Sequence, residues 1–275
     1  MMLSFNQVDY LGTAMRSVLR HESVELELIV VDPGSTDGSR ELAERIARGD
    51  SRVILIFEPD NGPADGLNKG FGRAQNEIVS YLNSDDIYLP GTLKKLEMLF
   101  NLNPHVDVFY GHGLILDEIN NGELNFAYSD KLTRTKLLTG TLRIIQQSTF
   151  FRNESLRAMR LKFNAENSSC WDFEFMVDGY MAGLSIKRIE DIFGILRIHS
   201  KSITGSNLIF DKYESDKNRI LLGIPPNIGA SNLLIARLYS FGYRILRRLK
   251  VLILQRKFQK RIKEIARIEA LGFME

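Results

Sequence analysis

Residues 78–86 read Ile78-Val79-Ser80-Tyr81-Leu82-Asn83-Ser84-Asp85-Asp86, an apolar run that ends in two adjacent carboxylates. The run predicts a buried strand whose polar end reaches solvent. Two neighbouring carboxylates each disfavour ionisation of the other. A divalent cation that prefers oxygen ligands removes this conflict. The alternative is a simple exposed turn, because Asn, Ser and Asp all favour turns.

The composition is that of an ordinary soluble globular protein, with 44% hydrophobic and 25% charged residues in a chain of 275. The first residues lack a basic segment followed by a long apolar one, so we expect no signal peptide. We also expect no membrane-spanning helix, because no stretch approaches 18 uncharged apolar residues. The single cysteine, Cys170, fits a reducing compartment and is expected to be a packed side chain rather than a nucleophile.

Short apolar runs alternate with segments of helical spacing in the first 120 residues. Three further runs, Leu26–Val31, Val53–Phe57 and Val106–Tyr110, have the composition of strands buried on both faces. The helical segments between the runs are Tyr10–Leu19, residues 42–46 and residues 93–100. This alternation predicts an α/β fold with parallel strands joined by right-handed crossovers.

The second half of the chain has a less regular pattern. It predicts strands at Thr149–Phe151, Ser185–Glu190 and Phe193–His199, and helices at Glu154–Met159 and Trp171–Ala182.

Acidic and glycine-rich turns follow three of the predicted strands. They are residues 32–39 after Val31, residues 58–63 after Phe57 and residues 83–86 after Leu82. Parallel strands end at one edge of their sheet, and such sheets bind ligands at that edge. We therefore expect these turns to converge on one site.

Seven sequence blocks occur along the chain in a characteristic order. They are Ser4–Gln7, Asp32–Ser39, Gly62–Phe71, Tyr81–Asp86, Gln147–Phe150, Trp171–Glu174 and Arg197–His199. Together they resemble the family-two inverting glycosyltransferases with the GT-A fold, over roughly residues 3–205. The resemblance implies a Rossmann-like, mostly parallel central sheet flanked by helices. It also implies a nucleotide-sugar donor, with UDP as the expected nucleotide, and a divalent Mg²⁺ or Mn²⁺.

The resemblance assigns a set of residues to the nucleotide-sugar donor: Ser4, Phe5, Asp32, Asp60, Lys69, Asn83, Ser84 and Asp86. Asp32 would accept the ring N–H of uracil, or would instead only cap the following helix. Lys69 would pair with the donor diphosphate, or would be a solvated helix charge.

The same resemblance implies a metal site and a catalytic base. Asp85 matches the last carboxylate of the family's acidic metal motif, in which Asn83 holds the first position. His199 matches a late histidine that helps bind metal or diphosphate, although a lone histidine at a strand end is also commonly structural. Asp172 matches the catalytic base, and a carboxylate is also favoured in the first turn of a helix. We expect Asp85 and Asp172 to face each other across one cleft.

Two residues beside Asp172 are implied at the acceptor. Trp171 would stack on the acceptor sugar, or would be a buried aromatic. Glu174 is the alternative base, although its two-residue offset turns it away from Asp172 on a helix.

Three departures from the family pattern stand out. The first strand is expected to be short, or the start codon to be misassigned, because only Met1-Met2-Leu3 precede Ser4. Pro33 removes a backbone N–H near the base site. His112 takes a position that is often acidic in the family.

The end of the chain differs in charge from the rest. Residues 231–275 contain 11 Lys or Arg and three Glu, a net charge of +8, whereas the remainder carries −6. Pro225 and Pro226 place the expected boundary near 223–230, between a catalytic domain of residues 1–222 and a basic amphipathic tail of residues 223–275. Residues 233–273 have helical spacing.

The basic residues of this tail would form a dense positive face: Arg244, Arg247, Arg248, Lys250, Arg256, Lys257, Lys260 and Arg261. Such a helix predicts contact with an anionic membrane, here the cytoplasmic face of the inner membrane. The alternative is a helical pair packed on the domain with its charges in water. We expect no nucleic-acid partner, because no aromatic or motif pattern supports one.

The sequence thus predicts a cytoplasmic, metal-dependent, inverting glycosyltransferase that acts on a saccharide or lipid-linked acceptor in cell-surface polysaccharide assembly. One alternative is a sugar-nucleotide nucleotidyltransferase, but residues 4–7 lack the glycine-rich basic loop expected there. Another is a non-catalytic subunit that binds nucleotide sugars, and the presence of both Asp85 and Asp172 argues against it.

Overall fold

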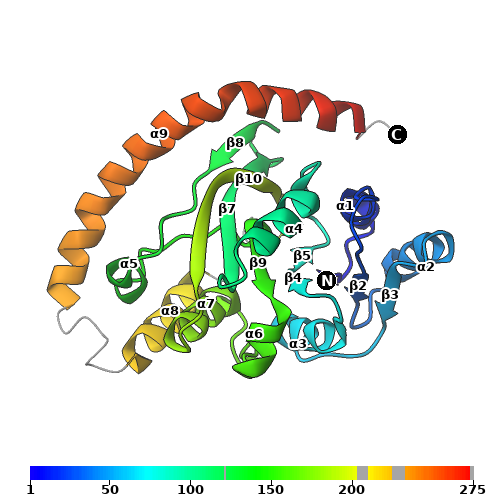
Figure 1. Cartoon of the computed structure of the whole chain (residues 1–275), viewed down its shortest axis with the longest axis horizontal. Coiled ribbons are helices and arrows are strands. Elements are labelled where there is room, and N and C mark those ends of the chain that lie inside the picture. Colours follow the sequence, from blue (N-terminus) through cyan, green and yellow to red (C-terminus); the bar gives the residue numbers. More distant parts are fainter. Residues whose placement is uncertain (121, 203–209, 225–232, 273–275) are drawn as a thin grey trace.

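The computed structural model describes residues 1–120, 122–202, 210–224 and 233–272 (Figure 1). Within this part, a first sheet has the strand order β3 (Val53–Ile56), β2 (Leu28–Val31), β1 (Met2–Leu3) and β5 (Leu82–Asn83). Its three pairings are parallel, with Met2 opposite both Val30 and Leu82. In this chain β1 has two residues, and it lies in the middle of this sheet.

Three amphipathic helices connect and cover the first sheet: α1 (Val8–Leu19), α2 (Ser39–Gly49) and α3 (Pro63–Arg73). Helix α3 packs on β1 and β2, and α1 packs on α2 and on β6 (Ile87–Tyr88). These helices and strands confirm the predicted alternation of strand and helix.

A second sheet forms the other half of the molecule. Its strand order is β4 (Ile78–Val79), β9 (Thr149–Arg152), β7 (Val108–Asp117), β10 (Ile186–Ile198) and β6, with β8 (Leu124–Ala127) on β7. Within the described residues, β7 and β10 pair in parallel and the other pairings are antiparallel. The predicted mostly parallel character thus holds for the first sheet and for the β7–β10 pair.

Two strand predictions need correction. The expected strand Ile78–Leu82 is divided, because the chain leaves the second sheet after Val79 and enters the first sheet at Leu82. The expected strands 185–190 and 193–199 are one strand, β10, whose register against β7 shifts between Arg188 and Gly194. A bulge of this kind keeps pairing continuous across a local break in the pattern.

The remaining helices flank the second sheet. They are α4 (Thr92–Leu102), α5 (Arg134–Leu138), α6 (Asn153–Ala158), α7 (Trp171–Met181), α8 (Phe210–Gly223) and α9 (Leu233–Gly272), with a 3₁₀ turn at Gln146–Ser148. The predicted helices in α6, α7 and the tail are confirmed. The predicted boundary falls largely on residues 225–232, which lie outside the described residues.

Helix α9 curves along the outside of the molecule past β8 and β10 (Figure 1). Its inner side joins a hydrophobic cluster through Phe258 and Ile265, and the Phe258 ring stacks on Phe126 with centroids 5.4 Å apart. Arg261 on the same side forms an ion pair with the buried Asp191. The described part of the tail is therefore one long helix rather than a helical pair, and it packs on the body.

We predict that replacing Phe258 with Ala lowers the free energy of unfolding by about 3 kcal/mol, because the change leaves a cavity against Phe126. Leu249→Ala on the same helix is the control, since Leu249 is 54% exposed, and it should change stability by less than about 0.5 kcal/mol. Chemical denaturation measures both values. Equal small effects would show that α9 is not packed on the body in solution.

Candidate active site

The loop after β2 is organised around the buried carboxylate of Asp32. Asp32 Oδ1 accepts hydrogen bonds from the backbone N–H groups of Gly34 (3.0 Å) and Ser35 (2.7 Å), and from Arg40 Nε (3.0 Å). Burial pushes the pKa of Asp32 up, but these donors and the Ser35 hydroxyl outweigh burial and leave the pKa lowered. The carboxylate is thus held ionised, and Oδ2 accepts one described bond, from Ser35 Oγ.

The loop after β1 lies against the Asp32 loop. Asn6 Oδ1 accepts from Thr36 N (2.9 Å), and Asn6 N donates to Ser35 Oγ (2.8 Å). Phe5 is 58% exposed beside these contacts, whereas Ser4 is buried and its hydroxyl has no hydrogen-bond partner in the described part of the chain. An exposed aromatic ring beside an ordered loop offers a flat surface on which a planar ring can stack. Asn6 and Ser35, which join the two loops, were missed by the sequence analysis.

The loop after β3 places Asp60 and Lys69 close to their own chain neighbours. Asp60 Oδ1 accepts from Gly62 N (2.9 Å), and burial raises the pKa of Asp60. Lys69 Nζ donates to the Pro59 carbonyl and lies 3.8 Å from Asp65 Oδ2. Both side chains are partly exposed, and their contact with a diphosphate stays a prediction.

The acidic turn at residues 83–86 is held from inside by Asp86. This carboxylate is fully buried and accepts from three donors: Asn83 Nδ2 (3.2 Å), Gln147 Nε2 (2.6 Å) and Arg197 N (3.0 Å). Burial, and then the neighbouring Asp85, raise the pKa of Asp86 well above its usual range, against the effect of the donors. Ser84 is buried too, and its backbone N–H donates to Leu3 O (2.9 Å). The direct sugar contact expected of Asp86 stays a prediction, because all the contacts described for this side chain are with protein.

Asp85 meets His199 at the end of β10. Asp85 Oδ2 lies 3.1 Å from His199 Nε2, and the His199 ring stacks on Tyr10 with centroids 4.2 Å apart. Nδ1 of the buried His199 has no hydrogen-bond partner among the described residues. The structure thus brings together the two residues that the sequence predicts as metal ligands.

The Asp85–His199 pair suits a cation that also binds substrate phosphate. No group of three His, Cys, Asp or Glu that could hold a metal occurs in the described residues. A carboxylate oxygen and an imidazole nitrogen are two suitable ligands, and Mg²⁺ sites typically combine one or two protein ligands with phosphate and water. The donor set therefore fits a divalent cation that arrives with a nucleoside diphosphate.

A group of residues missed by the sequence analysis supports this pair. The Arg197 guanidinium lies over the Tyr10 ring, 4.9 Å from its centroid. Glu118 contacts both residues: its Oε1 lies 3.4 Å from Arg197 Nε, and its Oε2 accepts a hydrogen bond from the Tyr10 hydroxyl (3.3 Å). Tyr10 and Glu118 are 108 residues apart in the chain. No local pattern in the sequence therefore indicates that they meet.

Asp172 lies in the first turn of α7 and lines a cavity of about 620 Å³. Burial raises the pKa of its carboxyl group, and Oδ1 accepts from Phe173 N (2.8 Å). The cavity wall is mainly apolar and aromatic, with cationic side chains from Arg143, Lys217 and Arg247. A half-buried carboxylate of raised pKa in such a cavity has the properties of a general base.

The two residues expected at the acceptor have structural contacts. Trp171 is partly buried against a hydrophobic cluster. Glu174 accepts from Asn164 Nδ2 (3.1 Å) and Asn167 Nδ2 (2.6 Å), so it holds the preceding loop rather than projecting freely. Acceptor contact by either residue stays a prediction.

The Asp172 cavity and the Asp85–His199 pair both adjoin the end of β10. Leu196 and Ile198 line the cavity, while the side chains of the alternating residues Arg197 and His199 contact Tyr10, Glu118 and Asp85 instead. The 3₁₀ turn repeats this division, because Gln146 lines the cavity and Gln147 binds Asp86. Among the described residues, Asp85 is not part of the cavity wall, so the single shared cleft stays a prediction.

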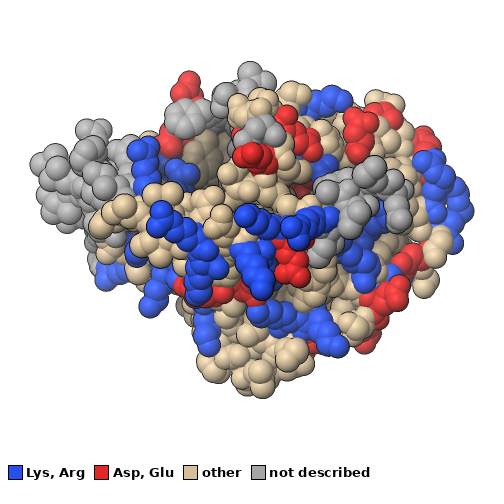
Figure 2. Space-filling model, turned by 90° about the horizontal axis from the view of Figure 1, so that it is seen from above, with Lys and Arg blue, Asp and Glu red and all other residues tan. Residues whose placement is uncertain are grey.

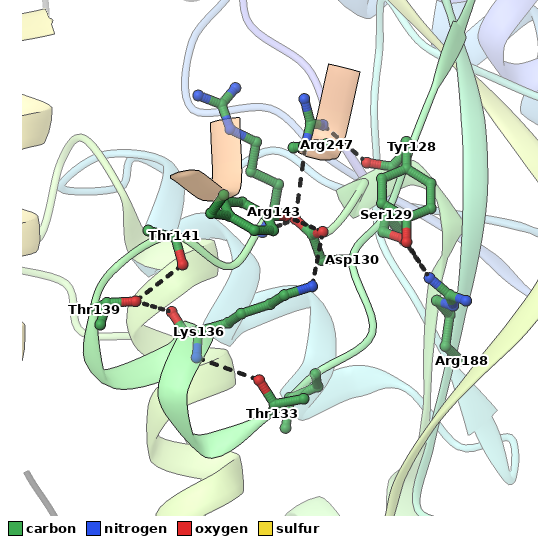
Figure 3. A network of polar contacts seen from close by, with 12 residues as sticks. Tyr128, Ser129, Asp130, Thr133, Lys136, Thr139, Thr141, Arg143, Arg188 and Arg247 are labelled. Atoms are coloured by element: carbon green, nitrogen blue, oxygen red, sulfur yellow. Dashed lines mark hydrogen bonds and ion pairs between the residues drawn. The ribbon is translucent and has the colours of Figure 1, made fainter. Parts of the chain in front are cut away.

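A polar network fixes the far wall of the cavity (Figure 3). The buried Asp130 accepts from Lys136 Nζ (3.1 Å), from Arg143 N (3.2 Å) and from the hydroxyl of Tyr243 in α9. Arg247 of α9 lies 3.7 Å from Asp130 and donates to the Tyr128 carbonyl (3.1 Å). Asp130 thus anchors the start of α9 where this helix forms part of the wall.

His112, one of the three departures from the family pattern, belongs to the same region. It is buried, its Nδ1 accepts from Ser129 N (3.2 Å) and its Nε2 lies 3.2 Å from Glu190 Oε2. Burial lowers the pKa of His112 despite the opposing effect of Glu190. The side chain is therefore a neutral structural group.

Curated relatives share sequence with part of this chain. An uncharacterized glycosyltransferase of Haemophilus influenzae is 31% identical over 63% of this chain and 68% of its own length. A putative teichuronic acid biosynthesis glycosyltransferase, TuaG of Bacillus subtilis, is 30% identical over 53% of this chain and 61% of its own. A GalNAc(5)-diNAcBac-PP-undecaprenol beta-1,3-glucosyltransferase of Campylobacter jejuni is 30% identical over 46% of this chain. The chain spans 40% of that protein and less than two thirds of TuaG.

Solved structures share the fold. TarS of Staphylococcus aureus (residues 1–349, with UDP-GlcNAc) superposes with a TM-score of 0.64 at 19% identity, over 80% of this chain and 64% of its own. The mannosyltransferase PcManGT of Pyrobaculum calidifontis, with GDP-Man and Mn²⁺, superposes with a TM-score of 0.65 at 14% identity, over the whole of this chain and 79% of its own. At these identities the likeness shows the fold, which is GT-A. Residues 1–165 match the family described as glycosyl transferase family 2, and the chain belongs to that family.

Proposed function

We propose that this protein is an inverting glycosyltransferase. It moves a sugar from a nucleoside-diphosphate sugar, most simply a UDP-sugar, to a hydroxyl of a saccharide or lipid-linked acceptor in cell-surface polysaccharide assembly. One observation carries the proposal: Leu196 and Ile198 at the end of β10 line the cavity that contains Asp172, and His199, the next residue, contacts Asp85. A proton acceptor and a pair suited to a cation thus adjoin the same strand end.

The chemistry follows from these positions. Asp172 accepts the proton of an acceptor hydroxyl while that oxygen attacks the anomeric carbon and the bond to the diphosphate breaks. A divalent cation held by Asp85 and His199 would neutralise the charge that develops on the leaving diphosphate. The Asp32 loop and Phe5 bind the base at the neighbouring strand end. Because the anomeric carbon undergoes a single displacement, its configuration inverts. No protein nucleophile is needed.

The known proteins support this assignment of substrates. TarS was solved with UDP-GlcNAc, and PcManGT with GDP-Man and Mn²⁺. The names of the Bacillus and Campylobacter relatives refer to teichuronic acid synthesis and to an undecaprenol-linked acceptor. We accordingly propose a polymeric or lipid-linked acceptor, and an enzyme that works at the cytoplasmic face of the inner membrane.

We predict that Asp172→Asn lowers transfer by at least about 100-fold, because the amide accepts no proton, while the affinity for UDP stays unchanged. Product formation from a UDP-sugar and direct UDP titration measure the two effects. Glu174→Gln is the matched control, since it keeps the size of the side chain and one acceptor oxygen for the Asn164 or Asn167 amide, and it should retain transfer. If Glu174→Gln abolished transfer and Asp172→Asn did not, Glu174 would be the base.

The raised pKa of Asp172 also predicts a stability effect. Burial disfavours the ionised carboxylate in the folded state, so the folded pKa lies above the unfolded one. Stability is therefore lost as pH rises through this interval, and the full loss is present at neutral pH. Asp172→Asn should raise the melting temperature at pH 7, and its advantage should shrink as pH falls toward about 4. An advantage independent of pH would contradict the raised pKa.

A third prediction concerns the cation. In the unmodified protein, EDTA should weaken UDP binding at least about tenfold relative to Mn²⁺, a change of about 1.4 kcal/mol. Asp85→Ala should bind UDP equally with Mn²⁺ and with EDTA, because the carboxylate ligand is gone. Asp9→Ala is the control, since its carboxylate is 67% exposed on α1, and it should keep the full effect of Mn²⁺. An effect of Mn²⁺ that survives in Asp85→Ala would place the cation elsewhere.

A further inference from the structure

The outer side of α9 exposes large aliphatic side chains. Leu246, Leu249 and Ile253 are 62%, 54% and 67% exposed. Their spacing of three and four residues places them on one face of the helix. A packed helix normally turns such residues inward, so this stripe is an apolar surface left in solvent.

Basic side chains surround the stripe. Arg248, Lys250, Arg256, Lys257 and Lys260 are all exposed, and residues 246–260 contain no Asp or Glu. Figure 2, which looks onto the side of the molecule that α9 occupies, shows Lys and Arg side chains gathered there with uncharged residues between them. The outer face of α9, defined by the three aliphatic and five basic residues, thus carries an aliphatic stripe that Arg256 and Lys260 continue along the same line. Arg248, Lys250 and Lys257 flank this line.

The opposite side of the helix fixes the orientation of this face. Arg247 and Arg261 point to the body, where they pair with the buried Asp130 and Asp191. The expected single positive face of the tail is therefore wrong for these two residues, because buried carboxylates bind them. Phe258 and Ile265 pack beside them, so the outer face is held outward by ion pairs and by apolar contacts.

We propose that the outer face of α9 docks on an anionic lipid bilayer, with Leu246, Leu249 and Ile253 inserted at the headgroup level. Exposed aliphatic residues between cations are the pattern of interfacial helices on anionic membranes. Charge complementarity disfavours a second copy of this face, because five cations would oppose five cations. Nucleic acid is disfavoured because the centre of the face is aliphatic and offers no ring on which bases stack.

The position of the stripe connects docking to the site. Arg247 and Val251, which line the Asp172 cavity, lie on the same turns of α9 as Leu249 and Ile253. Docking of the outer face thus places the helix that forms this part of the cavity wall on the lipid surface. This link between docking and catalysis rests on the proposed function, in which the acceptor is lipid-linked and would reach the cavity from the membrane surface. Among the helices in the described part of the chain, none qualifies as a membrane span.

Vesicle sedimentation of the full chain tests the inference. Vesicles of phosphatidylcholine with about 30% phosphatidylglycerol should bind the protein at least tenfold more tightly than pure phosphatidylcholine, and 0.5 M NaCl should weaken binding. Leu249→Ser with Ile253→Ser should reduce binding to the anionic vesicles at least tenfold, and Lys250→Gln with Lys257→Gln should reduce it similarly. Leu102→Ser with Leu222→Ser removes two leucines that are 75% and 77% exposed outside α9, and it should bind as the unmodified protein does.

Several results would overturn the inference. They are equal binding to the two kinds of vesicle, full binding by the Leu249/Ile253 variant, and concentration-dependent dimers that this variant abolishes. Melting temperature and UDP affinity, measured in solution, check that each variant is folded. Transfer to a soluble acceptor is assayed separately, so that vesicle binding without transfer rejects the proposed function alone, and transfer without vesicle binding rejects this inference alone.

Discussion

The buried carboxylate of Asp86 is the contact on which the arrangement of the site depends. Its three donors come from the acidic turn itself, from the 3₁₀ turn and from the backbone of β10. Each donor precedes or adjoins a residue of the site: Asn83 is two residues before Asp85, Gln147 follows Gln146 of the cavity wall, and Arg197 is two residues before His199. A buried polar group that loses a hydrogen-bond partner is strongly unfavourable, so the three segments are held in one geometry.

The same principle explains how the tail is placed. Asp130 and Asp191 are buried carboxylates that lie far from α9 in sequence, and each binds a cation of that helix. Two cations of the basic tail are thus paired with carboxylates of the acidic body inside the molecule. The remaining cations face solvent on the outer face of α9. One side of α9 therefore completes a cavity wall, and the other side presents aliphatic and basic side chains to solvent.

The sequence predicts those features that depend on local patterns. Short apolar runs identify the strands of the first sheet, and polar turns at their ends identify the Asp32 loop and the acidic turn. Local patterns do not show which sheet a strand joins, so Ile78–Val79 and Leu82–Asn83 were expected to be one strand. The supporting contacts of Tyr10, Glu118, Arg197 and Gln147 were missed for the same reason, because they join residues that are distant in the chain. Arg247 and Arg261 were assigned to the wrong side of the tail because their buried partners lie far away in sequence.

We propose that Asp85 and His199 form the protein's part of a cation site that a nucleoside diphosphate completes. Anomalous diffraction at the manganese edge, from crystals grown with UDP and Mn²⁺, tests this site. We expect an anomalous peak within bonding distance of Asp85 Oδ2 and His199 Nε2, beside the UDP phosphates. A bound UDP with its manganese peak remote from both side chains would contradict this proposal.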